Sequence, residues 1–213
     1  GITIQRGRNH AIFCGSQSSF TLRNCRLRNN HSTGQGGAIF LGTGTRTVIT
    51  GCTIESNSAD FGGGIWCQQT EASIDNCVIR NNRANTDGGG IRCSYADRMT
   101  ISNCVLYGNI AEEYGGGAYL DGVDVVVRNS VFEHNSANSG GGASLMEWTQ
   151  LVNCVFVDNS AGTTGGGICC GRSANDATLV NCTFRGNTAV EQGSGLSWPN
   201  GGRQTLTNCI VWG

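Results

Sequence analysis

Cysteine is the residue type with the greatest chemical potential in this chain. Twelve cysteines occur among 213 residues, and thiols at this density can form disulfides, bind metal ions or act in redox chemistry. Seven of them follow one another at intervals of about 26 residues, with a serine at one place in the series. This first series consists of Cys25, Cys52, Cys77, Cys104, Ser130, Cys154, Cys182 and Cys209.

Four further cysteines belong to a second series, in which they alternate with leucine and tryptophan. Because cysteine exchanges with large apolar residues there, we expect this series to be buried, with free cysteine acting as a small hydrophobe. Cys169 fits neither series, so we expect it to face outward as a reactive or cross-linking thiol. The members of the second series are Cys14, Leu41, Cys67, Cys93, Leu120, Leu145, Cys170 and Trp198.

Two interpretations of the cysteines stay open at this point. If each series is a stack of strands, its side chains lie about 4.8 Å apart, farther than the Cβ separation of about 3.5–4.5 Å that a disulfide prefers. That favours free thiols in ladders. A metal site is not expected, because the chain has no Cys-x-x-Cys motif. The alternative to free thiols is a set of disulfides between the two series, namely Cys14–Cys25, Cys67–Cys77, Cys93–Cys104 and Cys170–Cys182.

Carboxylates and imidazoles, the usual groups of hydrolytic and lyase chemistry, are scattered along the chain. Cleavage of a polysaccharide needs carboxylates clustered with a basic group. The closest acidic pairs, Glu112 with Glu113 and Asp121 with Asp124, are expected at turns that face solvent. We therefore predict no catalytic site, no cofactor and no metal, and a chain that is not an enzyme. The histidines are interpreted as isolated surface residues: His10, His31 and His134.

The elements that would position these side chains form an internal repeat. Each block of about 26 residues carries apolar residues three positions before and two positions after the first cysteine series. An asparagine stands five positions after that series, and a further apolar residue follows a run of glycines. The asparagines are Asn30, Asn57, Asn82, Asn109, Asn135, Asn159 and Asn187. The apolar residues two positions after the series are Leu27, Ile54, Ile79, Leu106, Phe132, Phe156, Phe184 and Val211.

Apolar and polar residues alternate over short runs within each block, which is the periodicity of strands rather than helices. About three short strands in each block predict one coil of a right-handed parallel β-helix, an all-β β-solenoid. The chain is then a single domain, residues 1–213, of about eight coils with open, uncapped ends. The asparagines are expected to hydrogen-bond from coil to coil and to adopt the left-handed backbone of a corner.

One outward-facing series contains large aromatic residues on neighbouring coils. Alternation places Phe13, Phe40, Trp66, Arg92 and Tyr119 on the outside of the predicted coils. Exposed and contiguous aromatic residues mark contact surfaces, so we predict that these five residues bind a sugar or another protein. The alternative is that a local loop covers them, or that they reflect only the high strand propensity of aromatic residues.

Charge and hydropathy narrow the choice of partners. The formal net charge is −1, so neither nucleic acid nor an anionic membrane surface is an expected partner. No apolar segment is long enough for a membrane span, and membrane insertion is not expected. The chain begins with glycine rather than methionine, which favours a processed product or a piece of a longer protein.

The repeat also resembles that of a known family. Phe-x-x-Asn motifs begin at Phe132, Phe156 and Phe184, and a Gly-Gly-Ala-Ile motif begins at Gly36. Together they resemble the repeats of the chlamydial polymorphic outer membrane proteins and of related secreted bacterial proteins. The resemblance implies an extracellular or cell-surface bacterial protein, often the passenger segment of an adhesin, and says little about a specific function.

Three functions are compatible with these expectations. The first is an extracellular structural element that stacks head to tail into a fibre or forms part of a surface stalk, because an open solenoid end is a sheet edge that invites pairing. Its partners would be other copies of the chain or the flanking coils of a longer chain. The alternatives are an adhesin or carbohydrate-binding segment, with a glycan as partner, and a polysaccharide lyase or hydrolase, which is less favoured.

Overall fold

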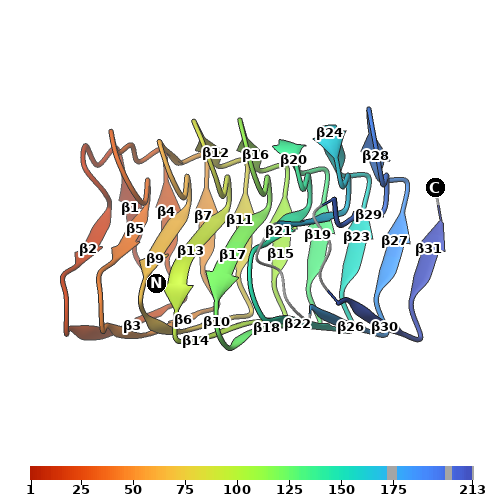
Figure 1. Ribbon diagram of the computed structural model, residues 1–213. Helices are drawn as coiled ribbons and strands as arrows, with labels where there is room; N and C mark the ends of the chain where they lie inside the picture. Colours follow the sequence, from red (N-terminus) through yellow and green to blue (C-terminus); the bar gives the residue numbers. More distant parts are fainter. Residues whose placement is uncertain (172–176, 200–202, 213) are drawn as a thin grey trace.

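The computed structural model is a rod of stacked coils (Figure 1), in which the described residues form 31 short strands joined by turns. It describes residues 1–171, 177–199 and 203–212. The strands form four parallel sheets, named A to D here in the order in which each coil visits them. Within the described residues no helix occurs, and therefore none that is long and apolar enough to cross a membrane. The prediction of an all-β parallel β-helix with about eight coils is confirmed.

Sheets A and D take one strand from each successive coil. Sheet A consists of β1 (Thr3–Gln5), β4 (Arg26–Arg28), β7 (Thr53–Glu55), β11 (Val78–Arg80), β15 (Val105–Tyr107), β19 (Val131–Glu133), β23 (Val155–Val157), β27 (Thr183–Arg185) and β31 (Ile210–Trp212). Sheet D consists of β3 (Ser19–Arg23), β6 (Arg46–Thr50), β10 (Glu71–Asp75), β14 (Arg98–Ser102), β18 (Val125–Arg128), β22 (Thr149–Val152), β26 (Thr178–Val180) and β30 (Thr205–Thr207).

Sheets B and C lie between them along each coil. Sheet B consists of β8 (Ser58–Ala59), β12 (Arg83–Ala84), β16 (Ile110–Ala111), β20 (Ser136–Ser139), β24 (Ser160–Thr164) and β28 (Thr188–Ala189). Sheet C consists of β2 (Ile12–Cys14), β5 (Ile39–Leu41), β9 (Ile65–Gln68), β13 (Ile91–Ala96), β17 (Ala118–Gly122), β21 (Ala143–Leu145), β25 (Ile168–Cys170) and β29 (Leu196–Ser197).

A complete coil has four strands instead of the predicted three. The additional strands form sheet B, where most are only two residues long, such as β8 and β12. They pair in register with one another directly after the buried asparagine of each block. The expectation of three strands is therefore corrected, and the reason is length, because two residues carry no readable alternation of apolar and polar positions.

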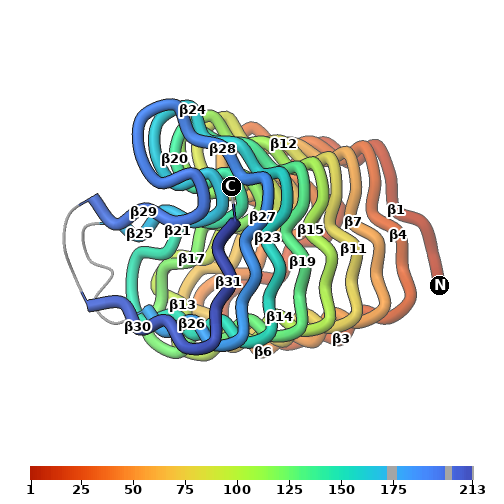
Figure 2. Tube along the Cα trace, turned by 90° about the vertical axis from the view of Figure 1, so that its right-hand side faces the viewer, coloured from red at the N-terminus to blue at the C-terminus, as the bar shows by residue number. Residues whose placement is uncertain are grey.

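The apolar residues of the repeat point into one continuous lumen, which the coils seen end on in Figure 2 enclose with their backbone. The apolar residues two positions after the first cysteine series are all 0% exposed from Leu27 to Phe184. In three successive coils this residue is phenylalanine, and in-register pairing places the rings over one another. The centroids of Phe132 and Phe156 lie 4.6 Å apart, and those of Phe156 and Phe184 lie 4.9 Å apart.

The predicted asparagine ladder is present and buried. Asn57 Nδ2 donates to Asn82 Oδ1 at 2.9 Å and to the carbonyl oxygen of Leu27 at 3.1 Å, while the backbone N–H of Asn57 also donates to Asn82 Oδ1. The same bonds recur from coil to coil. The left-handed backbone, however, belongs to the residue before each ladder asparagine, such as Ser56 with φ 54°. Stacking rather than a corner conformation therefore requires asparagine at these positions.

The glycine runs allow the closest approach between coils. Gly62 has φ +61°, a conformation that residues with a side chain rarely adopt. A Cβ on the next residue, Gly63, would collide with the carbonyl groups of Arg83 and Gly89 in the following coil. The glycines are thus required by the backbone of the neighbouring coil.

A substitution that creates a cavity in the phenylalanine stack tests this description of the core. Replacing Phe156 by alanine is expected to lower the free energy of unfolding by about 3–5 kcal/mol, because it removes the middle ring of the stack. Urea unfolding followed by circular dichroism measures the change. The control is Phe13→Ala, which truncates a ring that is 65% exposed. Equal stability of the Phe156 variant and the control would contradict the assignment of Phe156 to the lumen.

Candidate functional site

The predicted aromatic series lies in a second packed column outside the lumen. After sheet B each coil bends outward before it returns to sheet C, beside β20 and β24 in Figure 2. A residue at the end of sheet B or in this bend contacts the sheet C residue five positions later in the chain. We call this column of contacts the seam. Its pairs are Phe61 with Trp66, Asp87 with Arg92, Tyr114 with Tyr119, Ser139 with Ser144, and Thr164 with Cys169.

Arg92 occupies the centre of the seam. Its guanidinium carbon lies 4.8 Å from the centroid of Phe61, 4.9 Å from that of Trp66 and 4.6 Å from that of Tyr119. It also forms an ion pair with Asp87. Burial raises the pKa of Asp87, against the opposing charge of Arg92, and burial raises the pKa of Tyr119 to about 12. Groups of the same chain therefore enclose the guanidinium, and each cation–π contact adds about 0.5–2 kcal/mol.

The predicted exposure of the aromatic series is wrong for Trp66, which is only 6% exposed. Phe40, Arg92 and Tyr119 are half-buried, whereas Phe13 is 65% exposed and stacks on Phe40 with ring centroids 5.0 Å apart. The reason is the covering bend, because alternation shows which residues point away from the lumen but not what packs over them. Binding through these five residues stays a prediction, for which Phe13 offers the most open surface.

Cys169 is buried as well, which corrects its expected outward exposure. Its side chain does point away from the lumen, but it is 4% exposed in the seam, where its Sγ lies 3.5 Å from Thr164 Oγ1. The register places Ser144 and Ser197 on either side of it. Burial raises the pKa of the Cys169 thiol, so the thiolate that reacts or cross-links is disfavoured.

The other cysteines occupy the lumen wall in the two predicted series. All twelve are free thiols, so none of the alternative disulfides between the two series is formed. Cysteine and leucine exchange in the second series because its members lie at the same inward position of successive strands of sheet C. Cys93, for example, pairs with Cys67 on one side and with Leu120 on the other. Among the described residues no group of three or more histidine, cysteine or acidic side chains is arranged to hold a metal ion.

The acidic pairs lie near turns, as expected, but they differ in exposure. Glu112, Glu113 and Asp124 are exposed. Asp121 is half-buried, and burial together with the negative charge of Glu147 raises the pKa of its carboxyl group.

The histidines also differ from one another. His31 and His134 are exposed, as expected. His10 is half-buried, with its ring centroid 5.6 Å from that of Phe13 and 5.4 Å from that of Phe40. Its Nδ1 lies 2.8 Å from the carbonyl oxygen of Gly36, which ties the first coil to the second.

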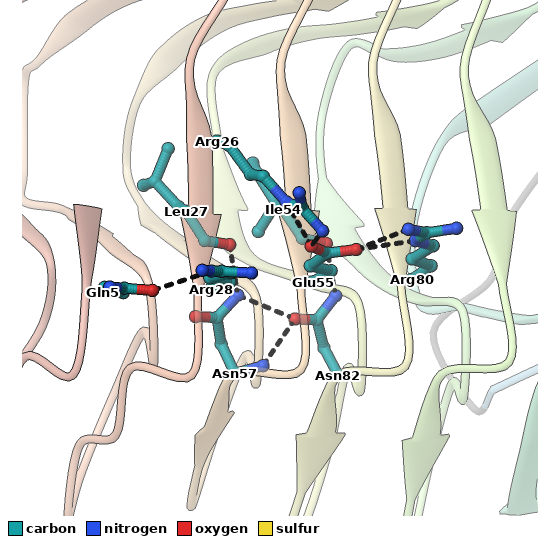
Figure 3. A network of polar contacts seen from close by, with 9 residues as sticks. All are labelled: Gln5, Arg26, Leu27, Arg28, Ile54, Glu55, Asn57, Arg80 and Asn82. Atoms are coloured by element: carbon teal, nitrogen blue, oxygen red, sulfur yellow. Dashed lines mark hydrogen bonds and ion pairs between the residues drawn. The ribbon is translucent and has the colours of Figure 1, made fainter. Parts of the chain in front are cut away.

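A charged network on the outer face of sheet A is the site that the sequence did not reveal (Figure 3). Glu55 in β7 is 6% exposed and forms ion pairs with Arg26 in β4 and Arg80 in β11. Arg80 donates from Nε and Nη2 to Glu55 Oε2 at 2.8 and 2.6 Å. Beside them Arg28 Nε donates to Gln5 Oε1 at 2.7 Å. Opposite charges one repeat apart are the sequence pattern that could have indicated this network.

The Glu55 carboxylate links its coil to the coils on both sides through the ion pairs with Arg26 and Arg80, and we call this arrangement the Glu55 clamp. Burial opposes its ionisation, but hydrogen bonds from Arg80 and Arg26 and their positive charges outweigh burial and lower its pKa. An acid with a lowered pKa is a poor proton donor at neutral pH. The network therefore joins three consecutive coils instead of offering a general acid.

A shallow groove crosses the outer face of sheet D near the first coils. It has a volume of about 480 Å³, and its outward side chains include Arg46, Val48, Glu71 and Arg98. Glu71 Oε2 lies 3.2 Å from Arg46 Nε, and Glu71 Oε1 lies 3.7 Å from Arg98 Nη2. A second, more polar hollow of about 330 Å³ adjoins the groove. It is lined by Gln17, Ser18, Ser19, Gly44, Thr45, Arg46, Gln69, Glu71 and Asp97.

Stacked parallel coils around an apolar lumen define the chain as a β-solenoid protein. A family model described as "right handed beta helix region" matches residues 10–184. The chain therefore belongs to the right-handed β-helix family, in agreement with the predicted fold. Neither a curated protein nor a solved structure matches it. The family specifies the fold, and function must be argued from the surfaces described above.

The Glu55 clamp predicts a stability that depends on pH. Because the folded state lowers the pKa of Glu55, the ionised carboxylate adds stability at neutral pH that is lost as the pH falls through the folded-state pKa. Glu55→Gln is expected to cost about 1–3 kcal/mol at pH 7 and to approach the wild-type stability near pH 3. Urea unfolding at both pH values measures this.

The control for this experiment is Glu112→Gln. Glu112 pairs with Arg83 at 2.8 Å, but both side chains are about half exposed, so the expected cost is below about 0.5–1 kcal/mol. An equal loss of stability for the Glu55 variant at pH 7 and pH 3 would show that the charge of Glu55 does not stabilise the fold.

Proposed function

We propose that this chain is a non-catalytic structural solenoid outside the cell or on a bacterial surface. In this proposal its end coils stack on further coils, supplied by the same polypeptide or by another copy placed head to tail. The chain then serves as a segment of a fibre or stalk. Right-handed β-helices occur among enzymes and among non-catalytic proteins, so the proposal rests on this chain's own residues.

The observation that carries the proposal is the exposure of lumen residues in the last described coil. Leu206 and Val211 are 40% and 53% exposed, whereas Leu179 and Phe184, which precede them in the same columns, are 1% and 0% exposed. A further coil in register would bury both side chains and pair the open strand edges. Burying each such side chain is worth about 1.5–3 kcal/mol.

Two other observations support a structural role. The asparagine ladder and the lumen residues repeat in coil after coil, whereas catalysis needs one distinct site. The resemblance of the Phe-x-x-Asn and Gly-Gly-Ala-Ile motifs to the chlamydial outer membrane repeats favours a secreted or surface location.

Stacking is tested by the state of association of the purified chain. Light scattering and electron microscopy over a range of concentrations are expected to show rods that lengthen with concentration. Val211→Asp would place an unpaired charge between stacked coils and is expected to weaken association at least about tenfold. The control is Val190→Asp, because Val190 is 80% exposed beside sheet B. A wild-type chain that stays monomeric at every concentration would contradict self-stacking.

The groove on sheet D supports a second candidate function, an adhesin or carbohydrate-binding segment. Arg46 and Arg98 are 77% and 73% exposed at their side chains and share Glu71 as an acidic partner. Guanidinium groups bind carboxylates with paired N–H donors. An acidic sugar chain laid across the coils is therefore the ligand that the groove would suit.

Binding to the groove is tested with hyaluronan octasaccharide as the acidic probe and dextran as the neutral one. Calorimetry is expected to detect only the acidic sugar, and Arg46→Ala combined with Arg98→Ala should weaken its binding at least about tenfold. Arg128→Ala is the matched control, since Arg128 is exposed on sheet D outside the groove. An equal loss of hyaluronan binding in the Arg128 variant would indicate nonspecific charge attraction. Absence of hyaluronan binding to the wild-type chain would exclude this sugar as a ligand of the groove.

A further inference from the structure

The thiols of the first cysteine series form an aligned column of sulfur atoms. Each donates to the carbonyl oxygen two residues earlier, at 3.3 Å from Cys52 to Thr50 and 3.2 Å from Cys77 to Asp75. Each of the two also contacts a carbonyl oxygen of the preceding coil, at 3.7 and 3.6 Å. The same two contacts recur at Cys104, Cys154, Cys182 and Cys209.

Identical contacts in each coil mean that the thiols share one rotamer. Neighbouring sulfur atoms are therefore separated by about one strand spacing, about 4.7–4.9 Å. A disulfide bond of about 2.05 Å would require the two coils or side chains to move by more than 2 Å. Two metal–sulfur bonds of about 2.3 Å laid end to end, in contrast, span about 4.6 Å. The column thus fits an ion that binds two sulfur atoms in a line.

We propose that this column binds soft monovalent d10 cations, Cu(I) or its analogue Ag(I), with each ion held between the sulfur atoms of adjacent coils. Thiolate ligands select soft ions of this kind. Zinc needs about four ligands in a tetrahedron, and the described residues provide no such group. The neighbouring pairs of the column are Cys25/Cys52, Cys52/Cys77, Cys77/Cys104, Cys154/Cys182 and Cys182/Cys209.

The sulfur column also receives a hydrogen bond from a backbone N–H group. The backbone N–H of Cys52 donates to Cys77 Sγ at 3.4 Å, which stabilises a thiolate. Binding exchanges protons for metal without redox change. Each inner thiolate bridges two ions, so the run of four thiols releases four protons and holds three cations, and the run of three thiols releases three protons and holds two cations. Each fully loaded run then carries a charge of −1.

Each run of cysteines includes one residue that is not fully buried. Cys25 and Cys209 are half-buried, whereas the cysteines between them in the column are buried. Ser130 divides the column into its two runs, and it keeps the geometry of the cysteines. Its Oγ donates to the Arg128 carbonyl oxygen at 2.8 Å and accepts from the Cys104 N–H at 3.2 Å. Serine and cysteine are therefore interchangeable at this position of the coil.

The experiment counts the ions bound by the full chain. The reduced protein is titrated with Ag(I) nitrate in chloride-free buffer under nitrogen, and native mass spectrometry measures the stoichiometry. Ser130→Cys joins the two runs by creating the pairs 104/130 and 130/154, so it is expected to bind two more ions than the wild type. Cys77→Ser removes the pairs 52/77 and 77/104 and is expected to bind two fewer.

Cys169→Ser is the matched control, because Cys169 is buried with serines on both sides of it in the seam. Its silver stoichiometry is expected to equal that of the wild type, and X-ray absorption should find two sulfur neighbours for each ion. Loss of one ion from both Cys77→Ser and Cys169→Ser would overturn the proposal, since each thiol would then bind alone. Absence of silver binding while circular dichroism shows a folded chain, or absence of free thiols in the purified protein, would overturn it as well. None of these outcomes bears on self-stacking.

Discussion

The in-register hydrogen bonding of parallel strands is the constraint on which the rest of this structure depends. It repeats the backbone at the strand spacing of about 4.8 Å, so residues one coil apart must touch. Side chains that tolerate a copy of themselves at that distance are therefore required along every inward column. Phenylalanine rings meet this requirement by parallel stacking, asparagine amides by donating to the next amide, and glycine by having no side chain where backbones meet.

This constraint made the fold predictable from the sequence, because period and residue type together identify a column. The lumen residues, the asparagine ladder and the two cysteine series were found in this way. Conformation within a column was not predictable, since a repeated asparagine suits both stacking and a left-handed backbone. The structure assigns the left-handed backbone to residues such as Ser56 and Asn81, each of which precedes a ladder asparagine. Sheet B was missed because most of its strands have only two residues.

The candidate site was harder to predict, because outward direction does not determine exposure. Trp66 and Cys169 both point away from the lumen, yet the bend after sheet B covers them. The sequence did contain a sign of this covering contact, because Phe61 stands five residues before Trp66 and Asp87 stands five residues before Arg92. The same holds for Glu55, whose arginine partners stand one repeat before and after it. Complementary pairs at such spacings indicate contact, whereas alternation alone indicates only a face.

Buried ladders also explain how coils of unequal length keep one register. Successive ladder asparagines are between 24 and 28 residues apart, yet the amide bonds continue without a break from Asn30 to Asn187. A slip of one residue would leave a buried amide unpaired in each affected coil, at a cost of about 1–3 kcal/mol. Differences in length must therefore be accommodated by the turns and bends outside the lumen. Residues in those segments and on the outer faces of the sheets are free to differ from coil to coil, so recognition of a specific ligand has to reside there. A function that the coils share, such as stacking or a row of thiols, can instead reside in the columns.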